Sequence, residues 1–367
     1  MHKDTDTPPL SVLQVVRPAA GGIRQHVLSL IAATDPPRVT HSIAAPAAFL
    51  RDLPTGTPAR TYPLEITARF VPHADLRAAR RLVQLARTVD VVHAHGLRAG
   101  WIAALAQSVR LFPFMLTAHN MAEGGLLARL AITIIGQRAQ AIIAVSQAVA
   151  DSLAALGVSP GKLRVVPNGI DLAHFAALPT QADARQALGI PEDTFTVGCI
   201  ARLSPEKGVD VLVQAAADLP AVSLLIAGDG SQRAMLQTHL PPNVRLLGRI
   251  PDTRALLAAL NVLVVPSRAE GQGIVALEAM AARVPLIASR VGGLAEMLTD
   301  TETALLVPAG DPTALAQAVT RLRDDTALQA HLTANAARLV RERYDHRRTI
   351  AAVLDVYAEV AADLVPT

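Results

Sequence analysis

The sequence predicts an α/β protein built from two doubly wound, Rossmann-like domains. Short apolar runs alternate with helix-like segments along the whole chain, which is typical of a parallel sheet covered by helices on both faces. The alternation breaks off near residue 170 and then restarts. The 367 residues also suffice for two domains, each with its own core.

The first half opens with a strand, a glycine-rich turn and a helix. The apolar run 11–16 is followed by Gly21-Gly22 and by a segment with helical periodicity at 23–33, which is how a nucleotide-binding α/β unit begins. Further strands are expected at 42–45, 89–93, 114–117 and 141–145, and helices at 74–88, 100–109 and 147–156.

The second half repeats this rhythm. Strands are expected at 196–201, 223–227, 244–247, 262–265, 286–288 and 304–307, with helices at 208–218, 233–239, 254–259, 274–282, 294–298 and 313–321. The tail 328–364 is almost entirely helical in pattern. We therefore expect a first domain at 1–172, a linker at 173–194, a second domain at 195–344 and a C-terminal helix at 345–367. The stretch 171–191, with Pro179 and Pro191, is expected to form linker and a short helix.

Composition excludes several classes of protein. Hydrophobic residues make up 51% of the chain and its mean hydropathy is +0.33, but polar residues interrupt the apolar stretches 132–143 and 255–266 before either could span a membrane. The single cysteine, Cys199, excludes an internal disulfide and a cysteine-built zinc site. The polar start, residues 1–9, does not indicate secretion, so a cytoplasmic protein is expected.

Charge is divided unevenly along the chain. The net charge of +3 is too small to indicate a nucleic-acid partner. Residues 1–172 carry 17 basic and 10 acidic residues (+7), whereas residues 173–367 carry 17 and 21 (−4). This division fits two domains with different partners.

The densest chemical signal is a pair of glutamates around a glycine-rich turn. Glu270 and Glu278 have seven residues between them, including Gly271 and Gly273, directly after an apolar strand. Such glycines free backbone N–H groups at the start of a helix, where they bind anions. We expect Glu270 to point from the loop into a site and Glu278 to accept hydrogen bonds from vicinal hydroxyls such as those of a ribose.

A second signal pairs two cations. Arg202 and Lys207 lie between the end of a strand and the start of a helix. Two cations at such a position suit a diphosphate, because arginine binds it with two hydrogen bonds and lysine adds a mobile point charge.

Together these features resemble the retaining glycosyltransferases of glycosyltransferase family 4, which have the GT-B fold. The order and spacing of Arg202 with Lys207 and of Glu270 with Glu278 match that family. So do the segments 167–171, 227–230 and 305–311 in the second half, and 21–22, 91–95, 117–120 and 144–146 in the first. The resemblance therefore covers nearly the whole chain and implies that the C-terminal helix packs back on the first domain.

The resemblance implies roles for individual residues. Arg202 and Lys207 would hold the donor diphosphate, Glu278 the nucleotide ribose, and Glu270 the transferred sugar. The segment Gly271, Gln272, Gly273 and Ile274 would bind sugar and phosphate through its backbone, Ile250 would meet the base, and Gly22 would offer a backbone N–H to the diphosphate. His119 would contact the donor sugar as a catalytic residue.

Some assignments stay open at this point. Gln272 stands where the family usually has a bulky apolar residue, so substrate preference there is unassigned. His95 also ends a strand, with a functional and a structural role equally supported, and His26 fits either the family pattern or an ordinary helix face.

The resemblance also bears on mechanism. It implies a front-face reaction in which the leaving phosphate helps to deprotonate the acceptor, with Glu270 positioning the sugar and not attacking it. The one D-x-D motif, Asp4 to Asp6, lies in the polar leader, so no metal and no other cofactor is expected. The donor is expected to be a UDP- or GDP-sugar, and the acceptor a hydroxyl compound that is lipid-linked or part of a cell-envelope glycan.

The predicted helix 74–88 indicates a second partner. It carries Arg77, Arg80, Arg81 and Arg87 among apolar residues. Such a helix fits either a solvated Rossmann helix or the inner face of a cell membrane, bound peripherally through anionic lipid.

Two other functions fit a chain of this class. One is a sugar-nucleotide epimerase on the same fold, which would need further carboxylates and histidines. The other is a non-catalytic protein that binds a nucleotide sugar, which would not need Arg202, Lys207, Glu270 and Glu278 together.

Overall fold

A computed structural model of the chain describes residues 9–18, 21–33, 38–122 and 124–362. The chain divides into two compact units, which we call the first unit (Met1–Pro167 with Arg347–Thr367) and the second unit (Asn168–His346). Each unit is an α/β fold with one parallel sheet, as the alternation of elements predicts.

The first unit is built on a seven-stranded sheet in the order β3-β2-β1-β4-β5-β6-β7. Its strands are β1 (Leu10–Val16), β2 (Val39–Ala45), β3 (Ala59–Pro63), β4 (Val91–His95), β5 (Phe114–Ala118), β6 (Ala141–Ala144) and β7 (Leu163–Val165). Its helices are α1 (Gly22–Ala33), α2 (Ala47–Arg51), α3 (Pro72–Leu85), α4 (Leu97–Gln107), α5 (Leu126–Arg138), α6 (Gln147–Ala155) and the C-terminal α15 (His346–Ala362).

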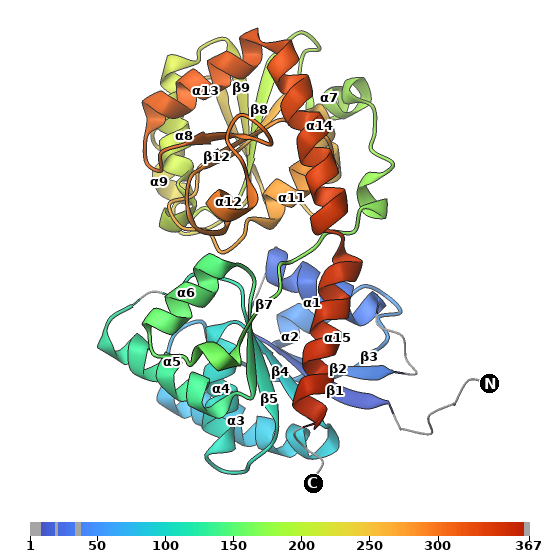
Figure 1. Ribbon diagram of the computed structural model, residues 1–367. Coiled ribbons are helices and arrows are strands. Elements are labelled where there is room, and N and C mark those ends of the chain that lie inside the picture. Colours follow the sequence, from blue (N-terminus) through green and yellow to red (C-terminus); the bar gives the residue numbers. More distant parts are fainter. Residues whose placement is uncertain (1–8, 19–20, 34–37, 123, 363–367) are drawn as a thin grey trace, which may run out of the picture. The chain divides into compact units, whose positions relative to one another are not determined.

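Alternate residues of these strands supply two separate cores. On one face, Leu13, Val92 and Leu116 pack with α3, α4, α5 and α6. On the other face, Val12 and Met115 pack with α1 and α15 (Figure 1). Strands buried on both faces must be apolar at nearly every position, which is why they appear in the sequence as short continuous apolar runs.

The second unit repeats this architecture with a six-stranded sheet in the order β10-β9-β8-β11-β12-β13. Its strands are β8 (Phe195–Ile200), β9 (Val222–Ala227), β10 (Val244–Gly248), β11 (Val262–Val265), β12 (Leu286–Ser289) and β13 (Leu305–Val307). Its helices are α7 (Gln181–Leu188), α8 (Val209–Ala215), α9 (Arg233–Gln237), α10 (Arg254–Ala259), α11 (Ile274–Ala281), α12 (Gly292–Met297), α13 (Pro312–Asp324) and α14 (Thr326–Arg343). Cys199 is buried in this core, and burial raises the pKa of its thiol to about 12.

In both sheets, successive strands are added first on one side of the starting strand and then on its other side. In the first unit β1 and β4 are neighbours, and in the second unit β8 and β11 are neighbours. The connections that follow these two neighbouring strands run to opposite faces of the sheet. The loops at their carboxyl ends therefore separate and leave room for a ligand. The fold therefore marks one position in each unit where polar loops are free to bind.

The structure differs from the sequence prediction at the domain boundaries. The division falls between Pro167 and Asn168, not after residue 172. Residues 173–194 contain the short helix that was expected there, α7, but they belong to the second unit: α7 packs on α10, and Ala184 and Ile190 are buried in that unit's core.

Other differences concern single elements. The sequence did not indicate β3, β7, α2 or α5. The long helical tail is interrupted between α14 and α15, where Asp345 pairs with Ile170 in an isolated bridge. Within the described residues, no helix is both long and apolar enough to cross a lipid bilayer.

Helix α15 completes the first unit even though it comes from the other end of the chain. Ile350, Val353, Val356 and Tyr357 are buried against β1, β4 and β5. This contact closes one face of the sheet with a segment more than 250 residues away in sequence from β4, which explains why sequence patterns alone do not define it.

We predict that Val353→Ala destabilises the first unit by about 1.5–3 kcal/mol, because it removes two buried methyl groups and leaves a cavity. Trp101, the one tryptophan of the sequence, lies in helix α4 of this unit, so its fluorescence during urea unfolding reports on the first unit alone. Asp355→Ala, at an exposed position of the same helix, is the matched control. An equal midpoint for both variants would show that α15 contributes no packing energy.

Candidate active site

The second unit gathers charged groups at the carboxyl ends of β8 and β11. Lys207 follows β8, and its Nζ lies 2.7 Å from Oε2 of Glu270 in the loop after β11. The Ser267 hydroxyl donates to the same carboxylate oxygen at 3.0 Å. Glu270 is 9% exposed, so this carboxylate is held in place by two donors in a site with little water.

The loop that carries Glu270 is fixed by close backbone contacts. The amide of Gly293, at the start of α12, donates to the Glu270 carbonyl at 3.1 Å. A Cβ atom on Gly293 would lie 2.0 Å from the Gly271 carbonyl oxygen, so only glycine allows this approach. Gly273 has φ +86° and leads directly into α11 at Ile274. The first amides of a helix bind anions well, so this end of α11 provides a place for a phosphate.

The side chain of Gln272 does not face this loop's opening. Its Oε1 accepts from the backbone amide of Asn168 at 2.7 Å and from the Asn168 side chain at 2.8 Å. Its Nε2 donates to the Asn168 carbonyl at 2.9 Å. The side chain is 3% exposed, so of the donor contacts expected for Gln272 only those of its backbone remain. In the family this position usually has a bulky apolar residue. Here Gln272 joins the loop to Asn168 by hydrogen bonds.

The other expected donor residues of the second unit lie around this loop with different exposures. Glu278 is buried on α11. Arg202 is 58% exposed and pairs with Glu206, Nη2 to Oε1 at 2.7 Å. Ile250 follows β10 and is half-buried against the core. The structure thus brings Lys207 and Glu270 into contact, while Arg202 is paired elsewhere.

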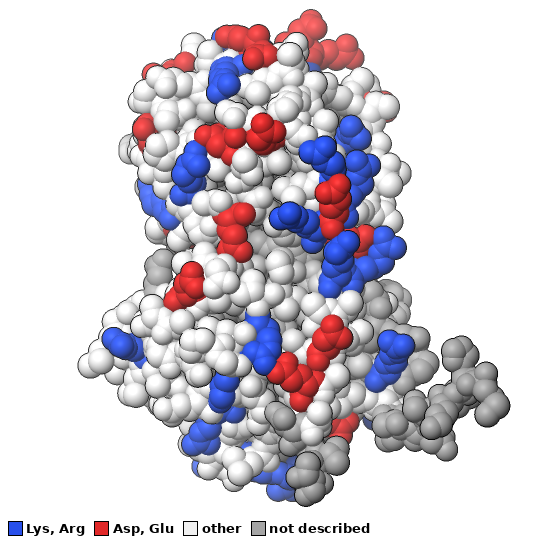
Figure 2. All heavy atoms as spheres, in the orientation of Figure 1, with Lys and Arg blue, Asp and Glu red and all other residues white. Residues whose placement is uncertain are grey.

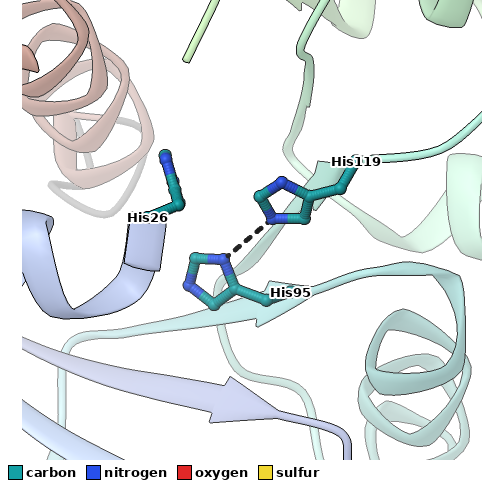
Figure 3. Close-up of side chains that lie close together, drawn as sticks. All are labelled: His26, His95 and His119. Carbon is teal, nitrogen blue, oxygen red and sulfur yellow. Dashed lines mark hydrogen bonds between the residues drawn. The ribbon is translucent and has the colours of Figure 1, made fainter. Parts of the chain in front are cut away.

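The first unit places its predicted residues at the ends of β1 and β5. Gly22 begins α1 and is half-buried. His119 directly follows β5 and is 8% exposed. Its Nε2 lies 3.4 Å from Nδ1 of His95, the last residue of β4, and its ring centroid lies 5.1 Å from that of His26 on α1 (Figure 3). The two histidines left open by the sequence therefore lie beside the one assigned to the site.

One buried glutamine organises this group. Gln14 on β1 donates through Nε2 to His41 Nδ1 at 3.0 Å and to the Tyr357 hydroxyl at 2.9 Å. Its Oε1 lies 2.7 Å from His95 Nε2. A carbonyl oxygen only accepts, so His95 carries its proton on Nε2. The lone pair of His95 Nδ1 therefore faces His119.

A second branch of the network reaches His93 on the same face of β4. Its Nδ1 lies 2.8 Å from the Tyr357 hydroxyl and its Nε2 lies 2.7 Å from Thr117 Oγ1. Tyr357 belongs to α15, so the C-terminal helix supplies a polar group to the interior of the first unit as well as apolar packing.

Burial keeps these histidines neutral. It lowers the pKa of His26 and of His41 to about 4. The pKa of His93, His95 and His119 lies well below the usual value, first because of burial and then because neighbouring imidazoles disfavour a second positive charge. The two sites therefore differ in charge: the site in the second unit contains ionised groups, and the site in the first unit contains neutral histidines.

Five polar residues of these sites were not predicted from the sequence: Gln14, His41, His93, Ser267 and Tyr357. The spacing His93-x-His95 offered a signal, since alternate residues of a strand share one face. Gln14 pairs in register with His93, but register between β1 and β4 is a tertiary property. Nothing in the tail sequence marked the Tyr357 hydroxyl as an interior group.

Comparison with known proteins agrees with this architecture. Residues 20–174 match the family described as Glycosyltransferase Family 4 and residues 180–339 match Glycosyl transferases group 1. The D-inositol 3-phosphate glycosyltransferase of Salinispora arenicola is 31% identical over 76% of this chain and 70% of its own length. The protein of the same name from Xylanimonas cellulosilytica is 35% identical over 74% of this chain and 72% of its own.

The chain belongs to glycosyltransferase family 4. Its fold is GT-B: the crystal structure of Anabaena Alr3699/HepE in complex with UDP and glucose superposes with a TM-score of 0.86 at 23% identity, covering 95% of this chain and 99% of that one. The protein is therefore a hexosyltransferase. Family membership decides against the epimerase and the non-catalytic binding protein that the sequence left open.

We predict that the stability of the first unit falls as pH is lowered from 7 to 5. The native histidines have depressed pKa values and stay neutral, whereas the unfolded chain takes up protons near pH 6.5. Each such histidine then contributes a slope of up to roughly 1.4 kcal/mol per pH unit.

Urea unfolding followed by Trp101 fluorescence measures this slope. His41→Gln should reduce it, while His73→Gln, at an exposed position of the same unit, should leave it unchanged. A midpoint that does not vary between pH 7 and pH 5 would contradict the assignment of neutral histidines.

Proposed function

We propose that this transferase moves a hexosyl group from a UDP- or GDP-sugar to a hydroxyl acceptor, with retention of anomeric configuration. The observation that carries the proposal is the Lys207–Glu270 pair beside the glycine loop that opens α11. It combines a lysine cation, a fixed carboxylate and the glycine-rich start of a helix at one strand end.

Lys207 is the proposed diphosphate ligand. In the ligand-free protein Glu270 neutralises it, and a diphosphate, with its greater negative charge, would draw the flexible ammonium toward itself. Arg202 would leave its exposed partner Glu206 to join it, which costs little because surface ion pairs are weak. The amides of Gly271–Ile274 would complete the phosphate site.

The remaining donor contacts follow from the family resemblance. Glu278 would accept hydrogen bonds from the ribose hydroxyls, and the backbone around Ile250 would meet the base. Gly22 would offer its amide to the diphosphate. His119, neutral at physiological pH, would hydrogen-bond the donor sugar near the anomeric centre.

Electrostatic stabilisation of the leaving diphosphate is the main task of such a site. Lys207 and Arg202 would supply the positive charge that in other transferases comes from a metal ion, so we propose that transfer needs no metal. Glu270 is held by Lys207 and Ser267 on one carboxylate oxygen. It would position the sugar, and the departing phosphate would take the acceptor proton on the same face.

A UDP-sugar is the donor we propose to test first. Support comes from the Anabaena protein, whose structure was determined with UDP and glucose. For the acceptor, relatives named for D-inositol 3-phosphate favour a polyol phosphate among the small acceptors, and the basic helix favours a lipid-linked or cell-envelope acceptor.

We predict that UDP binds in calorimetry in the presence of EDTA, and that Lys207→Ala weakens it by about 10–100-fold. That range corresponds to the loss of one charge-assisted hydrogen bond. Glu278→Ala should weaken it through the ribose contacts.

Matched controls are Arg321→Ala and Glu342→Ala, which remove the same charges at exposed positions of the second unit. GDP and ADP are titrated in parallel. If GDP binds and UDP does not, the donor base is guanine and not uracil. If none of the nucleotides binds, the proposed site is wrong.

We further propose that helix α3 rests on anionic lipid at the inner face of the cell membrane. Arg77, Arg80 and Arg81 on α3 and Arg87 just after it are all exposed, and the opposite face of α3 is buried against α4. Phe70, directly before the helix, is 64% exposed.

Helix α5 adds apolar surface to the same layer of helices. Leu126 and Leu127 are each 82% exposed and Leu130 is 56% exposed. Exposed apolar side chains near basic ones are the combination that binds a lipid interface.

We predict that the protein sediments with vesicles containing anionic lipid, and that the triple change of Arg77, Arg80 and Arg81 to Glu abolishes this. Each cation near the surface contributes about 1 kcal/mol. The control is the same charge change at Arg338, Arg341 and Arg343 of α14, where basic side chains also gather (Figure 2). Equal sedimentation of both triple variants would contradict a specific role for α3.

A further inference from the structure

We propose that His26, His95 and His119 form a binding site for a zinc ion or a similar transition-metal ion, distinct from any requirement of the transfer reaction. One ring nitrogen of each residue lies within 4.8 Å of those of the other two. The three rings come from α1, the end of β4 and the segment after β5, and they converge in Figure 3.

The separation of His95 and His119 fits metal ligands better than a hydrogen bond. Their facing nitrogens are 3.4 Å apart, beyond the usual 2.7–3.2 Å range for an N–H donor. Two nitrogens bound tetrahedrally to Zn²⁺ at about 2.0–2.1 Å lie about 3.4 Å from each other. Two of the three ligands are thus already at the spacing that the ion requires.

The proton positions also suit a metal. The Nε2–H of His95 is held by the carbonyl oxygen of Gln14 at 2.7 Å, which leaves the Nδ1 lone pair directed at the cluster. Metal-bound histidines nearly always donate their other N–H to such a carbonyl, which fixes ring and tautomer. His119 would bind through Nε2 as the neutral tautomer that carries its proton on Nδ1, so the charge of the protein is unchanged.

His26 supplies the third nitrogen. Its Nε2 is buried and has no hydrogen-bond partner in the described part of the chain, which is costly for a polar atom unless a ligand satisfies it. One ring nitrogen of His26 lies within 4.8 Å of those of the other two histidines, so its ring would move toward them on binding.

The donor set selects the ion. Three neutral imidazoles favour Zn²⁺, Co²⁺, Ni²⁺ or Cu²⁺ over Mg²⁺ or Mn²⁺, which prefer oxygen ligands. Within the described residues no carboxylate joins this group, so a fourth position is left for water or for a hydroxyl of a bound molecule. Three histidines with one open position form a site of the kind that catalytic zinc occupies.

Cobalt titration of the purified protein tests the site without any transfer assay. We expect one Co²⁺ per chain, with the visible absorption of a four-coordinate ion, displaced by Zn²⁺. His26→Ala and His95→Ala should abolish that absorption, and Gln14→Leu should weaken binding by about 10–100-fold. His174→Ala and His239→Ala remove exposed histidines and should bind like the wild type. Binding that survives in His26→Ala, or absence of the four-coordinate spectrum, would overturn the proposal.

Anomalous diffraction from wild-type crystals soaked in Co²⁺ provides a test that does not depend on folded variants. A single peak between the three rings supports the site, and peaks only at exposed histidines refute it.

A consequence for activity rests on the proposed function. Because His119 is also the residue proposed to contact the donor sugar, an ion bound to its Nε2 would block that contact. We expect Zn²⁺ to inhibit transfer and EDTA to reverse the inhibition, whereas Mg²⁺ has no effect. Cobalt binding without zinc inhibition would refute this consequence alone, and a protein that binds no nucleotide would refute the proposed function while leaving the cobalt result intact.

Discussion

Both faces of each parallel sheet in this protein must be covered by helices, and this constraint determines where chemistry can take place. Residues such as Val12 and Leu13 alternate between two cores, so a polar side chain in the middle of a strand, such as Gln14 or His93, is buried and hydrogen-bonded inside the unit. The carboxyl ends of the strands are the places where the chain leaves the apolar layers. Lys207, Glu270, His95 and His119 all lie at such ends, beside the neighbouring strands at which each sheet reverses its growth.

The two units use this position in opposite ways. In the second unit a buried carboxylate is balanced by a lysine and a hydroxyl, so the site is charged and can exchange one ionic partner for another when an anionic ligand arrives. In the first unit five histidines are held neutral by burial and by each other. A neutral cluster does not attract phosphate strongly, but it can donate a hydrogen bond to a sugar hydroxyl or offer lone pairs to a soft cation.

Close backbone contacts and side-chain hydrogen bonds fix the loops and side chains of both sites. The glycine at 293 lets the α12 backbone touch the Glu270 loop, and Gln272 ties the same loop to Asn168. Gln14 plays the corresponding part in the first unit, where one amide group fixes His41, His95 and Tyr357. The side chains of Gln272 and Gln14 contact no expected substrate, yet they fix the orientation of the functional groups.

The sequence by itself determined the fold class and the family, and it predicted the charged donor residues. These follow from local signals: apolar runs of strand length, glycines after strands, and fixed spacings such as that of Glu270 and Glu278. Only the tertiary structure decided that Gln272 turns to Asn168, that helix α7 belongs to the second unit, and that Tyr357 reaches Gln14 and His93 across the chain. Such contacts join residues distant in sequence, and they depend on strand register and helix packing, which no local pattern records.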